Sequence, residues 1–318
     1  MFKGEKKMSV EIFNGERSEE SVQFEKWLIS QSNKKSFSSI ENTKHFIKQR
    51  GTENIQPYVI GDDVNFLSDM NEQAFEGIQV FTLNDQKSLT QKVILYLHGG
   101  AWTNQPLNLH WLFMDKMAQS LNAKIIAPIY PKVPHFNYQD TYPKILNLYK
   151  EILGSVDSSN QLTIMGDSAG GNITLGLALL LKMNHLPQPK DIILLSACVD
   201  MGFENPLIAE YEEKDPMLAS EGMEVITKIW AADKHLNDPL ISPIYGDFKG
   251  LGKITHFIGT HECLYPDAIK FDEKLTEQGI EINTLVYPKM NHVFVVMPIP
   301  EAIDAQHKII NIISNQID

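Results

Sequence analysis

The sequence has few cysteines and little positive charge, and both shortages exclude classes of protein. Only two cysteines, Cys198 and Cys263, occur among 318 residues. That number is too small for a disulfide framework or a cysteine-based zinc site, so we expect two buried, reduced thiols. Lysine and arginine total 28 against 40 acidic residues, which gives a net charge of −12. This balance disfavours nucleic acid as a partner, because such a partner requires a basic surface.

Long hydrophobic runs are also missing. No apolar run approaches the ~20 residues that cross a bilayer. The N-terminal stretch MFKGEKKMSVEIFNGE has no apolar core of the kind found in signal peptides. We therefore expect no membrane span, a cytoplasmic location and no membrane partner, while the sequence leaves homo-oligomerisation open.

A regular alternation of short β-rich runs and helical runs begins at about residue 78. The inner runs, such as KVILYL and DIILLSAC, are continuously apolar, as expected for parallel strands that helices cover on both faces. The pattern predicts a doubly wound α/β fold. We expect strands at 78–83, 92–97, 123–130, 161–165, 191–198, 253–259 and 282–288 and helices at 109–121, 142–153, from 169, 267–278 and from 301.

Two segments depart from this alternation. Residues 1–55 are polar and sparsely apolar, which predicts N-terminal helices that pack on another part of the chain. Residues 200–245 carry DP and NP pairs and are too long for an ordinary connection. We interpret 56–199 and 246–318 as the core and both other segments as a cap or lid, because ligands bind at this edge of an α/β sheet. A surface insertion without function remains the alternative for 200–245.

The sequence GDSAG contains the candidate nucleophile, Ser168. It matches G-x-S-x-G and lies between a predicted strand, QLTIM, and a predicted helix, ITLGLALLLK. A serine on such a sharp turn is exposed by strained backbone, and small neighbours allow the strand and the helix to approach. A serine that merely caps a helix would not need both flanking glycines.

The sequence HGGAW, at residues 98–102, ends another predicted strand. Glycines at such a position let backbone N–H groups point at a developing oxyanion, and each donor contributes about 3–4 kcal/mol. A glycine turn without this role is the alternative. His98 precedes the glycines, so we expect it to brace the loop.

A serine hydroxyl needs a general base, and His292 is the candidate among ten histidines. It follows the last predicted strand, where the chain order serine, acid, histidine places the base. Two acids precede it in the stretch HECLYPDA. Glu262 lies on the loop after a strand, whereas Asp267 follows Pro266 at a helix start, where an acid is ordinary. We favour Glu262 as the triad acid and keep Asp267 as the alternative.

Together HGGAW, GDSAGG, GTHE and NHVF resemble the hormone-sensitive-lipase-like esterases of the α/β-hydrolase superfamily, over about residues 78–318. The resemblance implies an eight-stranded, mostly parallel sheet, a helical cap and ester hydrolysis without a metal or cofactor. It implies oxyanion donors at Gly100, Ala101 and Ala169, with Gly99 as a further candidate. The chain departs from the family at Ala101, where glycine is usual, and at Glu262, where aspartate is usual.

These observations predict a serine carboxylic ester hydrolase that acts on small or short-chain acyl esters through Ser168, His292 and Glu262 and an acyl-enzyme. Its partner is then a small-molecule acyl ester. Hydrolysis of amides or aryl-formamides with the same triad is an alternative, and a ligand-binding protein that has lost catalysis is another.

Overall fold

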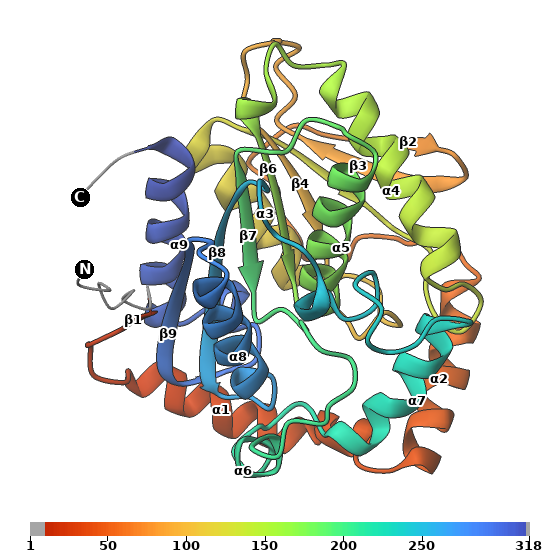
Figure 1. Ribbon diagram of the computed structural model, residues 1–318, viewed down its shortest axis with the longest axis vertical. Helices are drawn as coiled ribbons and strands as arrows, with labels where there is room; N and C mark the ends of the chain where they lie inside the picture. The colour runs from red at the N-terminus through yellow and green to blue at the C-terminus, as the bar shows by residue number, and fades with distance from the viewer. Residues whose placement is uncertain (1–9, 316–318) are drawn as a thin grey trace.

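A nine-stranded sheet forms the centre of the computed structural model, which describes residues 10–315 (Figure 1). The strand order is β1-β9-β8-β7-β6-β4-β5-β3-β2. Strands from β4 to β9 pair in parallel, while β3 is antiparallel to both β5 and β2. The strands are β1 (Val10–Ile12), β2 (Met70–Phe75), β3 (Ile78–Leu83), β4 (Val93–Leu97), β5 (Lys124–Pro128), β6 (Leu162–Asp167), β7 (Asp191–Leu195), β8 (Lys253–His261) and β9 (Ile282–Asn291).

Helices cover both faces of the sheet. Apolar residues of α4, α5 and α8 belong to one buried cluster, and those of α3 and α9 belong to another. No helix within residues 10–315 is long and apolar enough to cross a bilayer. The helices are α1 (Glu19–Gln31), α2 (Ile40–Asn54), α3 (Asn108–Leu121), α4 (Tyr138–Leu153), α5 (Ala169–Met183), α6 (Ile208–Glu212), α7 (Ser220–Ala231), α8 (Tyr265–Glu277) and α9 (Pro300–Ser314).

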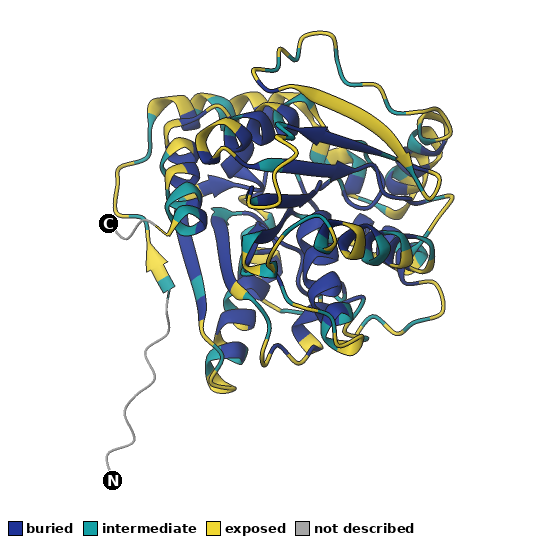
Figure 2. Ribbon diagram, turned by 90° about the horizontal axis from the view of Figure 1, so that it is seen from above, coloured by how far each residue is buried: buried dark blue, intermediate teal, exposed yellow. Residues whose placement is uncertain are grey.

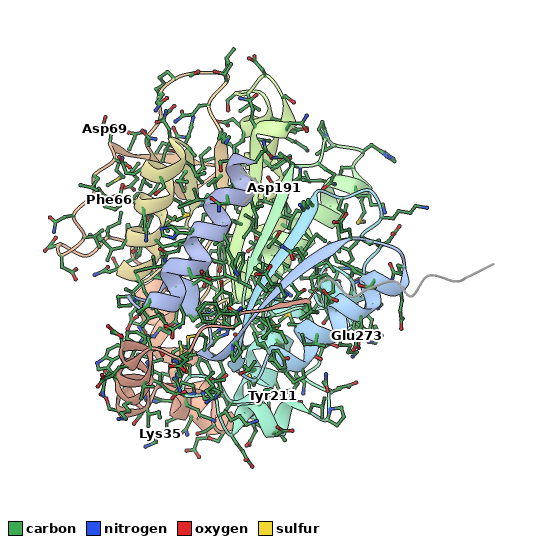
Figure 3. All side chains as sticks on the ribbon, turned by 90° about the vertical axis from the view of Figure 1, so that its left-hand side faces the viewer. Lys35, Phe66, Asp69, Asp191, Tyr211 and Glu273 are labelled. Carbon is green, nitrogen blue, oxygen red and sulfur yellow. The ribbon has the colours of Figure 1, made fainter. Side chains whose placement is uncertain are left out.

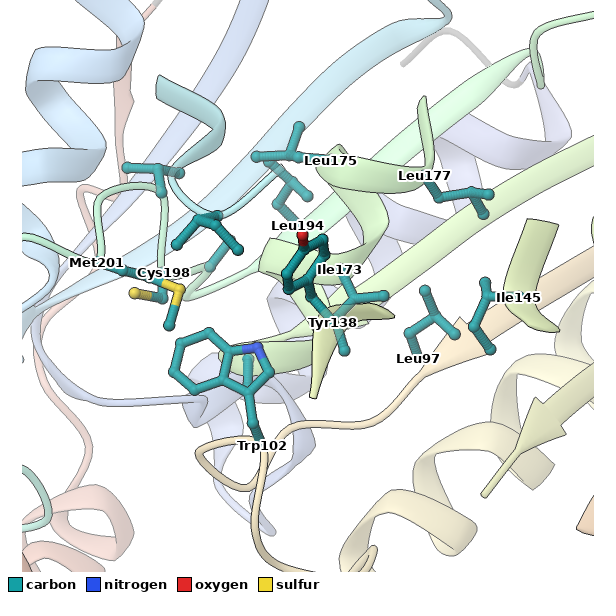
Figure 4. Packing of buried hydrophobic residues seen from close by; sticks show 14 of the residues in the cluster. Leu97, Trp102, Tyr138, Ile145, Ile173, Leu175, Leu177, Leu194, Cys198 and Met201 are labelled. Atoms are coloured by element: carbon teal, nitrogen blue, oxygen red, sulfur yellow. The ribbon is translucent and has the colours of Figure 1, made fainter. Parts of the chain in front are cut away.

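The central strands are buried along their whole length, as the continuous apolar runs predicted. Every residue of β4, β6 and β7 is buried, and Figure 2 shows dark blue, buried strands in the interior with exposed residues on the surrounding helices. Figure 4 shows Trp102, Cys198 and Met201, which belong to the same buried cluster as Leu97 and Ile173. Cys198 and Cys263 are buried and free, as expected.

Each expected strand and helix is present, but two edge strands were not expected. β2 has the sequence MNEQAF and is almost wholly exposed, so it lacks an apolar pattern. β1 is only three residues long and pairs with β9, which raises the expected eight strands to nine. It also places a strand in the segment expected to be helical. Residues 1–9 and 316–318 of the expected segments lie outside the described residues.

The N-terminal helices and the 200–245 insertion lie together at one end of the sheet. Figure 1 shows α1, α2, α6 and α7 at the end to which the β7 arrow points, and Figure 3 places Lys35 and Tyr211 at that same end, away from Asp191. α7 approaches the N-terminal segment so closely that a Cβ on Gly222 would lie 2.1 Å from the Thr43 hydroxyl oxygen.

We expect Gly222→Ala to separate these two segments and to lower the melting temperature. The added methyl would also lie 2.3 Å from the backbone oxygen of Phe37, and such overpacking costs about 1–3 kcal/mol. Gly154→Ala is the matched control, because its Cβ meets nothing nearer than 3.4 Å. Thermal unfolding followed by circular dichroism measures both, and equal melting temperatures for the two variants would contradict the tight contact.

Candidate active site

Ser168 occupies the sharp turn between β6 and α5 that its motif predicted. Its backbone has φ 51° and ψ −119°, a combination that L-residues rarely adopt and that marks strain. The flanking glycines allow the turn, because a Cβ on Gly170 would lie 1.9 Å from the Leu97 oxygen and one on Gly166 would lie 2.5 Å from the Gly170 oxygen. The Ser168 hydroxyl therefore projects from a rigid elbow.

The structure brings Ser168, His292 and Glu262 into one hydrogen-bonded line. The Ser168 hydroxyl oxygen lies 2.9 Å from His292 Nε2, and His292 Nδ1 lies 2.7 Å from Glu262 Oε2. Since a carboxylate can only accept, Nδ1–H donates to Glu262 and leaves Nε2 free to accept the serine proton. The arrangement has the geometry of a nucleophile, a base and an orienting acid.

Glu262 is fully buried, and both of its carboxylate oxygens accept hydrogen bonds. Oε1 accepts from the Ser196 hydroxyl at 2.8 Å and from the Gly259 amide at 2.8 Å. The Ser196 oxygen in turn accepts from the Val293 amide at 3.0 Å, so the loop of the histidine and the loop of the acid share one hydroxyl. Three donors around one buried carboxyl group fix it in position.

Asp267 lies apart from this line. It is in the first turn of α8, as its Pro-Asp context predicted, and its Oδ1 accepts from the Asn205 side chain at 2.9 Å. Burial raises the pKa of Asp267 to about 6, and no hydrogen bond joins it to His292 within the described part of the chain. The structure does not bring the alternative acid to the base.

The loop after β4, residues 98–103, is called the oxyanion loop here for its expected role, and its backbone is unusual. Gly100, Ala101 and Trp102 have φ of 118°, 52° and 54°, so two residues with side chains hold a conformation that favours glycine. The amides of Gly100 and Ala101 donate to no other group among the described residues. The Ala169 amide lies in the first turn of α5, where no intrahelical acceptor exists.

The expectation that Gly99 is a further oxyanion donor is wrong. Its amide donates to Asp167 Oδ1 at 2.8 Å and is therefore occupied. The motif alone did not reveal this, because the acceptor lies in the other motif, next to the nucleophile.

Asp167 joins the nucleophile elbow to the oxyanion loop. Besides the Gly99 amide, Oδ1 accepts from the Tyr96 hydroxyl at 2.7 Å, and Oδ2 lies 3.2 Å from His110 Nε2. His110 Nδ1 accepts from the Leu107 amide at 2.9 Å, so Nε2–H donates to the carboxylate. Burial raises the pKa of Asp167, but His110 and the hydrogen bonds outweigh this and leave that pKa below its ordinary value.

Both segments outside the core also contact the oxyanion loop. The Asn54 side chain, at the end of α2, donates to the Thr103 oxygen at 2.7 Å. The Trp102 indole packs on Trp230 of α7, with ring centroids 6.0 Å apart. The left-handed loop is thus held from the N-terminal segment and from the insertion.

A cavity of about 800 Å³ opens over Ser168 and His292, a volume typical of small-molecule sites. The core contributes Trp102 and Cys198 to its walls. The N-terminal segment contributes Phe24, Trp27, Leu28, Phe37, His45, Phe46 and Arg50, and the insertion contributes Phe203, Met217, Leu218 and Met223. Most of these side chains are apolar, while His45 and Arg50 of α2 add polar groups.

The electrostatics of His292 suit a base. Burial lowers its pKa, but the hydrogen bond and charge of Glu262, with the charges of Asp215 and Asp167, outweigh burial and raise that pKa above its ordinary value. His98 behaves oppositely, because burial and the nearby Lys132 and His110 lower its pKa well below the usual range. His98 Nδ1 lies 2.6 Å from the Gly99 oxygen. The neutral His98 ring is therefore hydrogen-bonded to the oxyanion loop.

Known proteins resemble this chain in sequence and in structure. Residues 94–296 match a family model described as the alpha/beta hydrolase fold. An esterase of Acinetobacter venetianus is 28% identical over 215 residues, which cover 67% of this chain and 71% of that protein. A triacylglycerol lipase of Mycobacterium tuberculosis is 27% identical over 224 residues, which cover 70% of this chain and 46% of the lipase.

Solved structures of esterases also resemble this chain. The crystal structure of a Staphylococcus aureus protein, provisionally named an esterase, superposes with a TM-score of 0.85 at 29% identity and covers 92% of this chain and 99% of its own. An esterase from the bacterial hormone-sensitive lipase family shares the fold, with a TM-score of 0.78 at 20% identity over 95% of this chain and 100% of its own. The chain belongs to the α/β-hydrolase family. The predicted fold class and membership of the α/β-hydrolase superfamily are confirmed, and the esterase and lipase relatives agree with the predicted resemblance to esterases.

Several residues around the triad had no sequence signal of their own. Asp167 lies inside the serine motif, but its partners Tyr96 and His110 are far away in the chain. Ser196 follows β7 and looks like any serine after a strand. A strand-end position near the sheet's carboxyl edge is the one cue that could have marked Ser196.

We expect Glu262→Gln to lose far more activity than Asp267→Asn. The amide places a donor against either His292 Nδ1–H or the Ser196 and Gly259 donors, and amidation of a triad acid in another protein lowers kcat by about 10⁴. Asp267→Asn removes no contact to the triad and should keep kcat within about threefold of wild type. Steady-state hydrolysis of a nitrophenyl ester measures both variants. Small, equal losses would show that Glu262 is not the working acid.

Proposed function

We propose that this ester hydrolase cleaves small or short-chain acyl esters with Ser168 as nucleophile, His292 as base and Glu262 as orienting acid. The observation that carries the proposal is the continuous line Ser168 Oγ, His292 Nε2, His292 Nδ1 and Glu262 Oε2, with steps of 2.9 and 2.7 Å. That line lies beneath a cavity large enough for a small ester.

Acylation follows from this geometry. His292 Nε2 removes the Ser168 proton as Oγ attacks the acyl carbonyl carbon, and the carbonyl oxygen takes the negative charge. In this mechanism the amides of Gly100, Ala101 and Ala169 donate to that oxygen; the left-handed loop backbone and the position of Ala169 in the first turn of α5 support this role. Glu262 keeps the imidazole in the correct tautomer and stabilises its charged form.

The leaving group and water complete the cycle. The imidazolium returns its proton to the leaving alcohol as the tetrahedral intermediate collapses to the acyl-enzyme. His292 then activates a water molecule, which attacks the acyl carbonyl, and the acid is released as Ser168 regains its proton. No step needs a group outside this chain and water.

The substrate size is inferred from the walls of the cavity. Trp102 of the oxyanion loop and Leu218 and Met223 of the insertion line the space around the serine. These buried apolar side chains favour uncharged acyl groups, since an unpaired charge there would lose its hydration. Long acyl chains would meet the Trp102 ring, which Trp230 supports from behind.

We also propose that residues 10–55 and 200–245 together form a cap over the core at 56–199 and 246–315. Their close contact at Gly222 and Thr43 and their shared cavity walls support this division. In this arrangement substrate selection belongs to the cap, and the chemistry belongs to the core.

A series of nitrophenyl esters tests the proposed function. We expect turnover of the acetyl to butyryl esters by wild type, a fall of at least about tenfold towards the decanoyl ester, and almost no turnover by Ser168→Ala. Matched anilides, run in parallel, separate ester from amide preference. Wild-type rates in the alanine variant would refute the nucleophile, whereas equal rates along the series would refute only the acyl size.

A further inference from the structure

One buried carboxylate of the insertion, Asp215, reaches the catalytic loops from outside the core. It follows α6 and is 2% exposed. Its Oδ2 accepts from the Cys263 amide at 2.9 Å, while Oδ1 accepts from the Met217 amide at 2.7 Å and the Leu218 amide at 2.9 Å. A carboxyl group that accepts from three backbone amides is a strong and well-defined anchor.

The groups that Asp215 holds belong to the site. Cys263 directly follows Glu262, so the bond fixes the backbone next to the triad acid. Met217 and Leu218 line the cavity over Ser168. On its other side, the backbone oxygen of Asp215 accepts from Lys34 Nζ at 2.9 Å, which joins the N-terminal segment to the same point.

We propose that Asp215 is a positioning residue. It fixes the Glu262 loop and the cavity wall relative to one another, and it supplies a negative charge that stabilises protonated His292. The inference rests on the proposed function, because it assigns the insertion a part in the same triad. The insertion then contributes to the chemical step as well as to substrate binding.

The charges around both groups support this role. Burial lowers the pKa of His292, but the Glu262 hydrogen bond and the charges of Glu262, Asp215 and Asp167 outweigh it, so this pKa lies above its ordinary value. Burial raises the pKa of Asp215, against the opposing effects of His292 and the three amides.

Neither of the other ionisable groups near Asp215, Cys263 and Lys34, supplies a negative charge in its place. The Cys263 thiol is fully buried, and burial, followed by the charges of Asp215, Glu262 and Glu212, raises the pKa of that thiol well above the usual range. Lys34 donates to the backbone oxygens of Glu212 and Asp215 and does not pair with the Asp215 carboxylate in the described structure. Within the described residues the Asp215 carboxylate therefore accepts from backbone amides, and its charge acts on His292 through space.

The sign of the expected pH effect follows directly. His292 must be neutral to accept the serine proton, so activity falls at low pH as the imidazole becomes charged. Removing the Asp215 charge destabilises the imidazolium and lowers the pKa of His292. The acid limb of kcat/KM should therefore move to lower pH, even though kcat itself falls because the acid loop is misplaced.

The test compares Asp215→Asn with Asp272→Asn. Asp272 is a suitable control, because it is fully buried on α8, accepts from the Thr284 hydroxyl at 2.7 Å and has no contact with the triad in the described structure. We expect Asp215→Asn to lose roughly tenfold to a hundredfold in kcat and to shift its acid limb downward by about half a pH unit or more. Asp272→Asn should keep the wild-type acid limb.

Asp215→Glu separates charge from position. It keeps the charge but displaces it, so we expect reduced kcat with an acid limb near that of wild type. Histidine NMR titration of His292 in Ser168→Ala protein, with and without Asp215→Asn, gives the same pKa shift without any turnover. A missing esterase activity would refute the proposed function and leave this titration decisive for Asp215.

An unshifted His292 titration in folded Asp215→Asn protein would overturn the proposal. So would failure of both Asp215 variants to fold, since Asp215 would then be a residue of stability alone.

Discussion

The buried carboxylate of Asp167 is the constraint on which the catalytic geometry depends. It is next to Ser168 in the chain, yet its oxygens accept from Gly99, Tyr96 and His110. A charge at this depth is tolerated only because each of these donors is present. The nucleophile elbow and the oxyanion loop are consequently fixed to one another, and strained backbone at Ser168, Ala101 and Trp102 can persist because its surroundings hold it.

The segments outside the core extend this support. Asn54 holds the oxyanion loop through the Thr103 oxygen, and Trp230 packs on the indole of Trp102. Asp215 binds the amide after Glu262. The insertion therefore contacts the oxyanion loop and the acid loop separately, so a change in its sequence alters both the cavity wall and the loops beneath it. Substrate preference and catalytic rate are expected to vary together in such an arrangement.

Much of the fold was predictable, because buried parallel strands and amphipathic helices have strong local patterns. The motifs around Ser168 and His292 were predictable for a related reason, since a strand–turn–helix context requires small residues at fixed positions. β1 and β2 were not, because a three-residue strand and an exposed edge strand carry no hydrophobic period. The engagement of the Gly99 amide and the approach of Asp215 to Cys263 join residues far apart in sequence. Such pairings depend on packing, which a single sequence does not display.

Covalent labelling of Ser168 tests the central claim most directly. A fluorophosphonate reacts with a serine only where a base activates the hydroxyl and amides stabilise the developing charge. The account predicts one equivalent of label on the peptide that contains Ser168, found by mass spectrometry, and none in folded Ser168→Ala protein. Label on another residue such as Cys198, or no label on folded wild-type protein, would contradict it.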